Sequence, residues 1–464
     1  MKKLSGIIVI ALIIALLSAP MLLGRQAQGH IEQVVESLNN YPGYEANIKS
    51  YQRSWLTSTV EVELGIDVAQ FNSEELAGLP SMTFKVLLAI DHGPVLLNDG
   101  VAVGLYAWRA GPAGETLTTV HDALALEGDE PFYRVWGKTS LLGETEFQDK
   151  ARGFTLQTPE LNADFSGYQG EGRVTRGGEL SYQGAMTEAS FSDGSSSASM
   201  RGLNAELAAD LAHLDWRTMV YPGSMELTLE GAEFRTPFGG SGGLDALRVA
   251  SDVELSDDGG AFDVVSEVSL DKVMGDAGAA TDLKIVMSLV NVDLDAYRAY
   301  LDAYTEVMQA ASADAATPEA PDFSKMFNQE VMQQFVARGP EIRIDELAFT
   351  VPQGTMEADL AMTFDKESEV PEQEMIMFWL MTAVSVNANA ELDRPLAEMF
   401  AQLGAAAQGM TPGDGSDPGV DMLNMMIAQG IFTESDGKIK TELNMADGSF
   451  TVNGQPFPLG AMMQ

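Results

Sequence analysis

Apolar and polar side chains alternate along much of this chain, and a period of two restricts it to folds built from strands. Every even-numbered position from Val60 to Val68 is apolar, while Glu61, Glu63 and Asp67 lie between them. The alternation recurs from residue 283 to residue 289. Because successive side chains of a strand point to opposite faces, each run predicts a strand with one buried and one solvated face. Such strands are typical of antiparallel sheets.

The rest of the sequence indicates a mainly β fold of the α+β class. Between residues 130 and 290, short alternating runs are separated by Gly, Asp and Ser, and the crossover helices of a parallel, doubly wound sheet are missing. We therefore expect a large, curved antiparallel sheet with a few helices toward the C-terminal half. Strands are predicted at 84–90, 154–157, 264–268 and 385–392, hairpins at 342–364 and 438–452, helices at 294–311, 326–335, 395–407 and 421–429, and linkers at 312–321 and 409–419.

An almost unbroken apolar stretch, Leu4 to Leu23, follows Met1-Lys2-Lys3 at the start of the sequence. About 20 helical residues rise about 30 Å, which is the thickness of the hydrocarbon core of a bilayer. The stretch is therefore predicted to be a transmembrane signal anchor. Since two lysines precede it and Arg25 alone follows closely, the positive-inside rule places the N-terminus in the cytoplasm. We expect the remainder in the periplasm, on the outer side of a bacterial inner membrane.

A cleaved signal peptide is the alternative, because Ala27-Gln28-Gly29 resembles a cleavage site. The uncleaved anchor is favoured, since the apolar stretch is longer than a usual signal sequence and Pro20 directly follows Ala19, the other small-residue candidate. Both interpretations place the body in the same compartment.

The patterns divide the chain into four segments. The sequence leaves open whether the body is one continuous sheet or two sheet-containing units joined near residue 315. Spacings of three and four between apolar residues predict a short amphipathic helix from His30 to Asn39. The segments are the anchor at 1–24, a juxtamembrane helix at 25–40, a β-rich periplasmic body at 41–290 and an α+β part of the same body at 291–464.

Composition excludes several classes of function. The 464 residues carry 68 acidic against 27 basic side chains, a formal net charge of −41, so the chain repels nucleic acid. It has no cysteine, which removes disulfides, thiolate nucleophiles and cysteine-based metal sites. Its four histidines are far apart in the sequence. We therefore expect no metal, no cofactor and no nucleic-acid partner.

The dipeptide Asp91-His92 is the candidate for catalysis, because a carboxylate beside an imidazole is half of a nucleophilic triad. Adjacent strand residues point to opposite faces, however, and Gly93-Pro94 follows directly. The interpretation that we favour is a structured turn. We therefore expect no catalytic residue in this chain.

Three other groups of residues also favour structure over chemistry. Asp293, Asp295 and Asp302 could bind a hard cation, but the first two lie where a helix is predicted to begin, and acids are stabilised there. The run from Gly239 to Gly243 matches the Gly-x-Ser-x-Gly nucleophile elbow, yet Pro237 and the small residues favour a loop. Neither that run nor Gly170-Glu171-Gly172 has the lysine and hydroxyl of a phosphate-binding loop.

Several short motifs resemble those of the YdgA family of bacterial membrane-anchored proteins, a domain of unknown function. They are the apolar N-terminal stretch, the segment from Tyr51 to Ser58, the turn at 91–94, and a closing Asn-Gly-Gln. Within the second of these, Ser54 stands where the family usually has glycine. The resemblance implies an inner-membrane location, a β-rich periplasmic body and self-association, and it supplies no catalytic residues. The positions that match the family, expected to be structural, are Tyr51, Arg53, Asp91, His92, Gly93, Pro94, Asn453, Gly454 and Gln455.

The leading hypothesis is a non-catalytic envelope protein that binds a partner or supports an assembly at the inner membrane. The alternative is a module that binds or transfers lipid or another hydrophobic ligand in an apolar groove formed by one-sided strands. An enzyme centred on His92 is the third hypothesis. The expected partners are the lipid bilayer, through residues 4–23, a second copy of the chain, and an envelope protein or lipid ligand.

Overall fold

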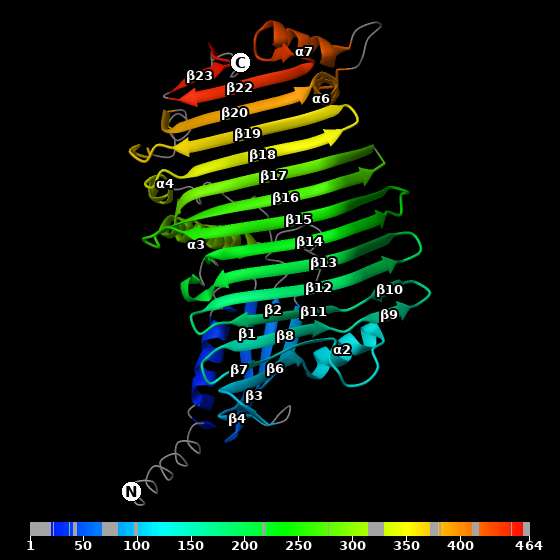
Figure 1. Ribbon diagram of the computed structural model, residues 1–464, viewed down its shortest axis with the longest axis vertical. Helices are drawn as coiled ribbons and strands as arrows, with labels where there is room; N and C mark the ends of the chain where they lie inside the picture. Colours follow the sequence, from blue (N-terminus) through cyan, green and yellow to red (C-terminus); the bar gives the residue numbers. More distant parts are fainter. Residues whose placement is uncertain are drawn as a thin grey trace, which may run out of the picture. The chain divides into compact units, whose positions relative to one another are not determined.

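A computed structural model of the chain consists mostly of antiparallel β-sheet (Figure 1). It describes residues 20–457 except 22, 37, 40–43, 67–81, 97–100, 216–217, 219, 277, 314–328, 372–378, 380–381, 411–416 and 447. The stretch predicted to cross the membrane lies almost entirely outside this part, as do most of the two predicted linkers. No helix among the described residues is both long enough and apolar enough for a membrane crossing.

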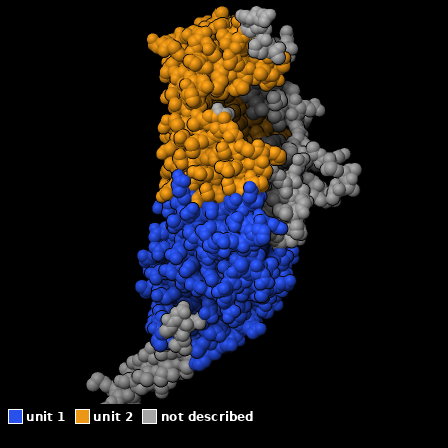
Figure 2. Space-filling view, turned by 90° about the vertical axis from the view of Figure 1, so that its right-hand side faces the viewer, with its two compact units in different colours: residues 1–194, 201–223, 305–321 blue, residues 195–200, 224–304, 322–464 orange. Residues whose placement is uncertain are grey.

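The chain forms two compact units, which Figure 2 distinguishes by colour. The first contains residues 1–194, 201–223 and 305–321, and the second contains residues 195–200, 224–304 and 322–464.

The first unit is built on an antiparallel sheet against which an N-terminal helix, residues 23–36, is placed. A short additional hairpin joins β4 (Val95–Leu96) to β5 (Ala102–Val103). In the order in which they pair, the strands of the sheet are β1 (Tyr44–Arg53), β2 (Thr57–Ile66), β3 (Met82–His92), β6 (Tyr106–Pro112), β7 (Tyr133–Thr139), β8 (Thr145–Ala151), β11 (Tyr168–Val174), β12 (Glu179–Ser192), β10 (Asn162–Phe165) and β9 (Phe154–Gln157).

The second unit is a meander, in which most strands pair with the next strand along the chain. An ion pair of 2.8 Å between Arg248 and Glu226 joins β14 (Gly223–Arg235) to its sheet. The paired strands are, in order, β15 (Ser241–Leu255), β16 (Ala261–Gly275), β17 (Gly278–Asp293), β18 (Glu341–Val351), β19 (Gly354–Phe364), β20 (Val384–Asp393), β22 (Lys438–Ala446), β23 (Ser449–Val452) and β24 (Gln455–Pro456), with β21 (Thr433–Ser435) beside β22.

The two faces of this second sheet differ in polarity. One face carries ion pairs between neighbouring strands, such as Lys284 with Glu346 at 2.7 Å and Lys440 with Glu391 at 2.6 Å. The other face is mainly apolar, because the alternation of each strand is in phase with that of its neighbour. One row of directly paired residues on that face contains only apolar side chains: Val253, Val264, Leu289, Ile342, Met362, Val386 and Met445.

Helices cover parts of the apolar face, and two of these contacts are buried clusters. At one, Val336 of α4 (Gln329–Val336) belongs to a buried cluster with Trp379 and Phe364, against which Ile342 and Met362 pack. At the other, α6 (Arg394–Ala407) and α7 (Pro418–Ala428) bury Ala397 and Leu423 against Ile439 of β22. On strand β17, which pairs with β18, Met287 and Leu289 remain 47% and 40% exposed. The sheet therefore has an apolar strip without full cover.

Most strands and helices predicted from periodicity are confirmed, including α3 (Leu294–Ala313), but two predictions need correction. The segment predicted as the juxtamembrane helix, 25–40, is helical up to residue 36, in one run with residues 23 and 24. The strands from β12 to β17 are 13 to 16 residues long rather than short. Ser241 to Gly243 start β15, so only the first part of the predicted loop is a turn. The helix α2 (Gly114–Leu124) was not predicted.

Candidate functional site

Several residues of the family motifs meet at the first turns of the N-terminal helix. The Tyr51 hydroxyl of β1 donates to the carbonyl oxygen of Gly24 at 3.3 Å and to the Ser58 hydroxyl at 3.2 Å. The Tyr106 hydroxyl of β6 donates to the carbonyl oxygen of Leu23 at 3.2 Å. Hydrogen bonds from two strands, β1 and β6, therefore hold the helix at the point where the apolar stretch of the sequence ends.

Gly24 and His92 are in close contact at the centre of this site. A Cβ atom added to Gly24 would lie 2.5 Å from Cε1 and 2.8 Å from Nδ1 of His92, and 3.2 Å from Cδ of Arg53. Only a residue without a side chain permits such an approach. We call Gly24, Tyr51, Arg53, His92 and Tyr106 the helix-docking site.

His92 is fully buried, and neither ring nitrogen has a hydrogen-bond partner among the described residues. Burial lowers the pKa of His92 below its usual value, and the backbone of Trp55 and the carboxylate of Asp91 oppose that effect. Asp91 and His92 are consecutive in β3, so they face opposite sides of the sheet. Asp91 therefore does not orient the His92 ring in the way that the carboxylate of a nucleophilic triad does.

The turn after β3 fixes His92 through backbone hydrogen bonds. The amide of His92 donates to the carbonyl of Leu56 at 2.7 Å, and the amide of Gly93 donates to that of Leu105 at 2.7 Å. A Cβ atom at Gly93 would overlap the carbonyl oxygen of Gly104, and the Gly93–Pro94 peptide bond is cis. The Asp-His-Gly-Pro motif thus builds a tight turn beside the helix-docking site.

The remaining motif residues lie elsewhere, in the second unit. Asn453 has a left-handed backbone (φ 49°) in the turn between β23 and β24, followed by Gly454 at φ 71°. Its side-chain oxygen accepts a hydrogen bond from the amide of Glu442, while its side-chain nitrogen donates to the carbonyls of Gly430 and Ile431 at 2.8 and 2.9 Å. Asn453 therefore ties the last hairpin to the segment that follows α7.

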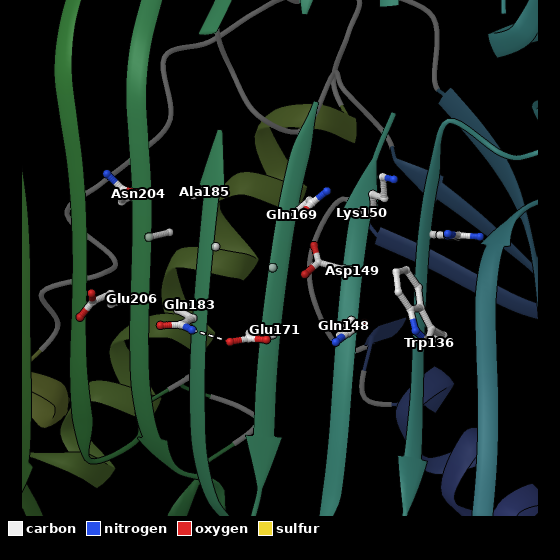
Figure 3. Close-up of a pocket in the computed structure, with 14 residues that line it drawn as sticks. Trp136, Gln148, Asp149, Lys150, Gln169, Glu171, Gln183, Ala185, Asn204 and Glu206 are labelled. Atoms are coloured by element: carbon white, nitrogen blue, oxygen red, sulfur yellow. Dashed lines mark hydrogen bonds between the residues drawn. The ribbon is translucent and has the colours of Figure 1, made fainter. Parts of the chain in front are cut away.

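A polar pocket of about 560 Å³ lies on the sheet of the first unit, on strands β7, β8, β11 and β12 and on β13 (Ser197–Asp210) (Figure 3). Directly paired residues form one row across it, and in that row the amide of Gln183 donates to Glu171 at 2.6 Å. The indole of Trp136 lies beside the Arg134 guanidinium, 4.6 Å from ring centre to Cζ. The row consists of Trp136, Gln148, Glu171 and Gln183.

The opposite side of the same strands holds a network of three tyrosines around the buried carboxylate of Asp149. The hydroxyls of Tyr133 and Tyr182 donate to the two oxygens of Asp149 at 2.9 and 3.0 Å, and Tyr168 bonds to Tyr182. Burial, together with these hydrogen bonds, raises the pKa of Tyr133 and Tyr182. The network fixes the strands beneath the pocket and was not predicted. Its members come from four neighbouring strands, β7, β8, β11 and β12, with one residue from each strand, so no local pattern in the sequence marks the network.

A family described as bacterial protein of unknown function (DUF945) matches residues 1–460 of the chain. The chain belongs to this family. Comparison with curated proteins and with solved structures found no match. The description of the DUF945 family gives no activity, so the function has to be argued from the geometry.

The other candidates in this DUF945 protein have structural partners. Asp293 accepts the amide of Ala296 at the start of α3 and the Arg338 guanidinium at 2.9 Å, as expected for an acid at the start of a helix. Asp295 pairs with Arg298. No group of three or more potential metal ligands occurs within the described ranges. Ser241 opens a strand and bonds to Asp276, so the strand-to-helix turn that a nucleophile elbow needs is not formed there.

Proposed function

We propose that this DUF945 protein is a membrane-anchored protein of the bacterial envelope, of the YdgA type, which acts by binding and not by catalysis. In this proposal residues 4–23 cross the inner membrane from the cytoplasm, and the body lies in the periplasm. The observation that supports it is the helix-docking site. Three strands hold Leu23 and Gly24 directly after the apolar stretch, an arrangement suited to a permanent anchor.

The absence of cysteine allows a direct test of this orientation. A single cysteine is introduced either as Lys2→Cys or as Phe238→Cys, whose side chain is 98% exposed. In cells with a permeabilised outer membrane, a maleimide that cannot cross the inner membrane should label position 238 alone. Position 2 should react only after the inner membrane is lysed. Labelling of both positions, or of neither, before lysis would contradict the proposal.

Binding is tested by chemical crosslinking in intact cells, followed by purification of the full chain under denaturing conditions. The expected product is a discrete adduct, either with a second copy or with another envelope protein. Equal recovery with and without the crosslinker would speak against a role in an assembly.

Hydrophobic-ligand binding is a second candidate, favoured by the apolar strip of the second unit. The apolar row crosses seven paired strands, and α4 with its cluster covers the row on β18, β19, β20 and β22. The part of the strip on β17 keeps exposed apolar surface, against which an acyl chain can pack. The half-exposed Met287 and Leu289 lie within it. In this candidate function the strip holds the tail of a lipid while the charged face stays in water.

Lipid that copurifies with the full chain, measured by native extraction and mass spectrometry, tests this candidate. Met287→Glu should reduce the bound lipid several-fold, because a carboxylate is costly to desolvate beside acyl chains. Val265→Glu is the matched control, since Val265 is 44% exposed and lies on the charged face of the adjacent strand. A wild-type chain without lipid, or equal losses in both variants, would eliminate this function.

A further inference from the structure

One end of the sheet in the first unit exposes several large apolar side chains. Val101 and Leu142 are 83% and 75% exposed. Turns at the end of a sheet usually carry small or polar residues, so a concentration of aliphatic and aromatic groups indicates a contact surface. We call the exposed residues Trp55, Leu56, Val101, Val103, Leu141 and Leu142 the apolar rim.

Backbone hydrogen bonds link the turns that carry this rim. The amide of His92 bonds to Leu56 in the turn between β1 and β2, and the amide of Gly93 bonds to Leu105 at the start of β6. The amide of Leu105 in turn bonds to the carbonyl of Thr139, at 2.8 Å, where the turn to β8 begins. These turns, together with the β4–β5 hairpin, therefore lie side by side at one end of the sheet (Figure 1).

The N-terminal helix starts at the same end. The carbonyl of Leu23 accepts from Tyr106, which directly follows the turn at Leu105, and Met21 is half exposed. In the sequence, the apolar stretch that begins at Leu4 ends here. The most hydrophobic segment of the chain and the apolar rim are thus neighbours.

Chemistry at the rim fits a lipid surface. Trp55 combines an apolar ring with a polar N–H group, the combination found where membrane proteins cross from lipid to water. Exposed Arg53 and Lys138 lie in the strands that lead to the rim, although the whole chain carries a net charge of −41. Cations at this position can approach phosphate groups of lipids.

We propose that the apolar rim is a second membrane contact, which inserts into the headgroup region of the bilayer beside the anchor. The proposal rests on the membrane anchorage proposed above. It adds that this end of the sheet in the first unit contacts the bilayer directly, in addition to the contact made by the anchor.

Lipid-attached quenchers test the proposal on the full chain in vesicles of phosphatidylethanolamine and phosphatidylglycerol. Bimane is attached to single cysteines introduced as Val101→Cys, Leu142→Cys or Phe238→Cys. Nitroxide-labelled lipids should quench the two rim positions several-fold more strongly than position 238. Equally weak quenching at all three positions, in protein that floats with the vesicles, overturns the rim contact alone. Failure of the protein to float with vesicles overturns the anchor.

A second variant separates lipid contact from contact with another copy of the chain. Leu141→Glu together with Leu142→Glu should leave flotation and melting temperature unchanged and lower the quenching at position 101. In the Leu142→Cys protein, aqueous iodide measures whether the bimane is accessible to water. If the bimane is protected from iodide but is not quenched by nitroxide lipids, protein covers the rim, and the proposal is overturned.

Discussion

Gly24 gives the helix-docking site its tightest contact, and a neighbouring glycine of the same helix provides a matched control. Gly24→Ala places a methyl group against the buried His92 ring, so we expect overpacking to lower the free energy of unfolding by about 1–3 kcal/mol. Gly29 has open space around its Cβ position, so Gly29→Ala should raise stability by up to about 1 kcal/mol through helix propensity. Denaturant unfolding of the full chain in detergent measures both. Equal effects of the two substitutions would argue against a close contact at Gly24.

His92 predicts a specific dependence of stability on pH. The pKa of His92 in the folded chain lies below that of a histidine in the unfolded chain, about 6.5. At pH values between these two pKa values, the unfolded chain therefore binds more protons than the folded chain. Stability should therefore fall as the pH falls below about 6.5. His92→Gln should flatten this part of a plot of melting temperature against pH, whereas His30→Gln, at an exposed position of the helix, should not. A slope that persists in the first variant would assign the effect to other groups.

At the scale of single residues, the sequence predicted a turn at Asp91-His92-Gly93-Pro94 but not what the turn is for. The close approach of Gly24 to His92 joins residues about 70 positions apart, and neither periodicity nor local turn chemistry describes such a contact. The structural role expected for Asn453 rested only on a family resemblance. Its bonds to Gly430 and Ile431 depend on how the last hairpin returns over the preceding segment.

At the scale of elements, the stability of the last hairpin depends on the side chain of Asn453. Asn453→Gly retains the left-handed backbone but removes three side-chain hydrogen bonds. The carbonyl of Gly430 loses its Asn453 donor, while that of Ile431 keeps the Thr441 hydroxyl at 3.0 Å. We expect the free energy of unfolding to fall by about 1–3 kcal/mol. Hydrogen exchange should increase first in β22, β23 and residues 430–431. Asn47→Gly, at a half-buried position of β1 in the first unit, should not change exchange in this hairpin.

The lengths of strands were harder to predict than their existence. Gly170, Gly172 and Gly184 interrupt the apolar alternation of β11 and β12, and glycine usually marks a turn. In the structure the ring of Phe147 lies over Gly172, and the hydroxyl ends of Tyr168 and Tyr182 lie over Gly184 and Gly170. The missing side chains are thus replaced by aromatic groups from neighbouring positions.

The helix α2 was missed for a different reason. Ala113 precedes it without a side-chain hydrogen bond, and Ala125 ends it in the left-handed conformation that glycine usually supplies. Its first turn is instead held from outside, since the Thr116 hydroxyl accepts a hydrogen bond from the amide of Lys85 in β3. A tertiary contact of this kind cannot be predicted from the residues in and next to the helix.

For the whole molecule, the excess of acidic residues predicts that salt stabilises the fold. With 68 acidic and 27 basic side chains, repulsion acts over the Debye length, which shortens from about 30 Å at 0.01 M salt to about 8 Å at 0.15 M. The melting temperature should therefore rise over this range of sodium chloride. The same titration on Val265→Lys, which adds a positive charge to the acidic protein, should show a smaller rise. A falling melting temperature would mean that ion pairs such as Lys284 with Glu346 outweigh the repulsion.

The meander of the second unit also bears on how the protein reaches its native state. From β15 to β20, each strand finds its partner in the strand made just before it. Only short loops have to close in most of these steps, and low contact order favours rapid folding. A polypeptide that emerges gradually, N-terminus first, can thus assemble this sheet by adding one strand at a time to a growing edge.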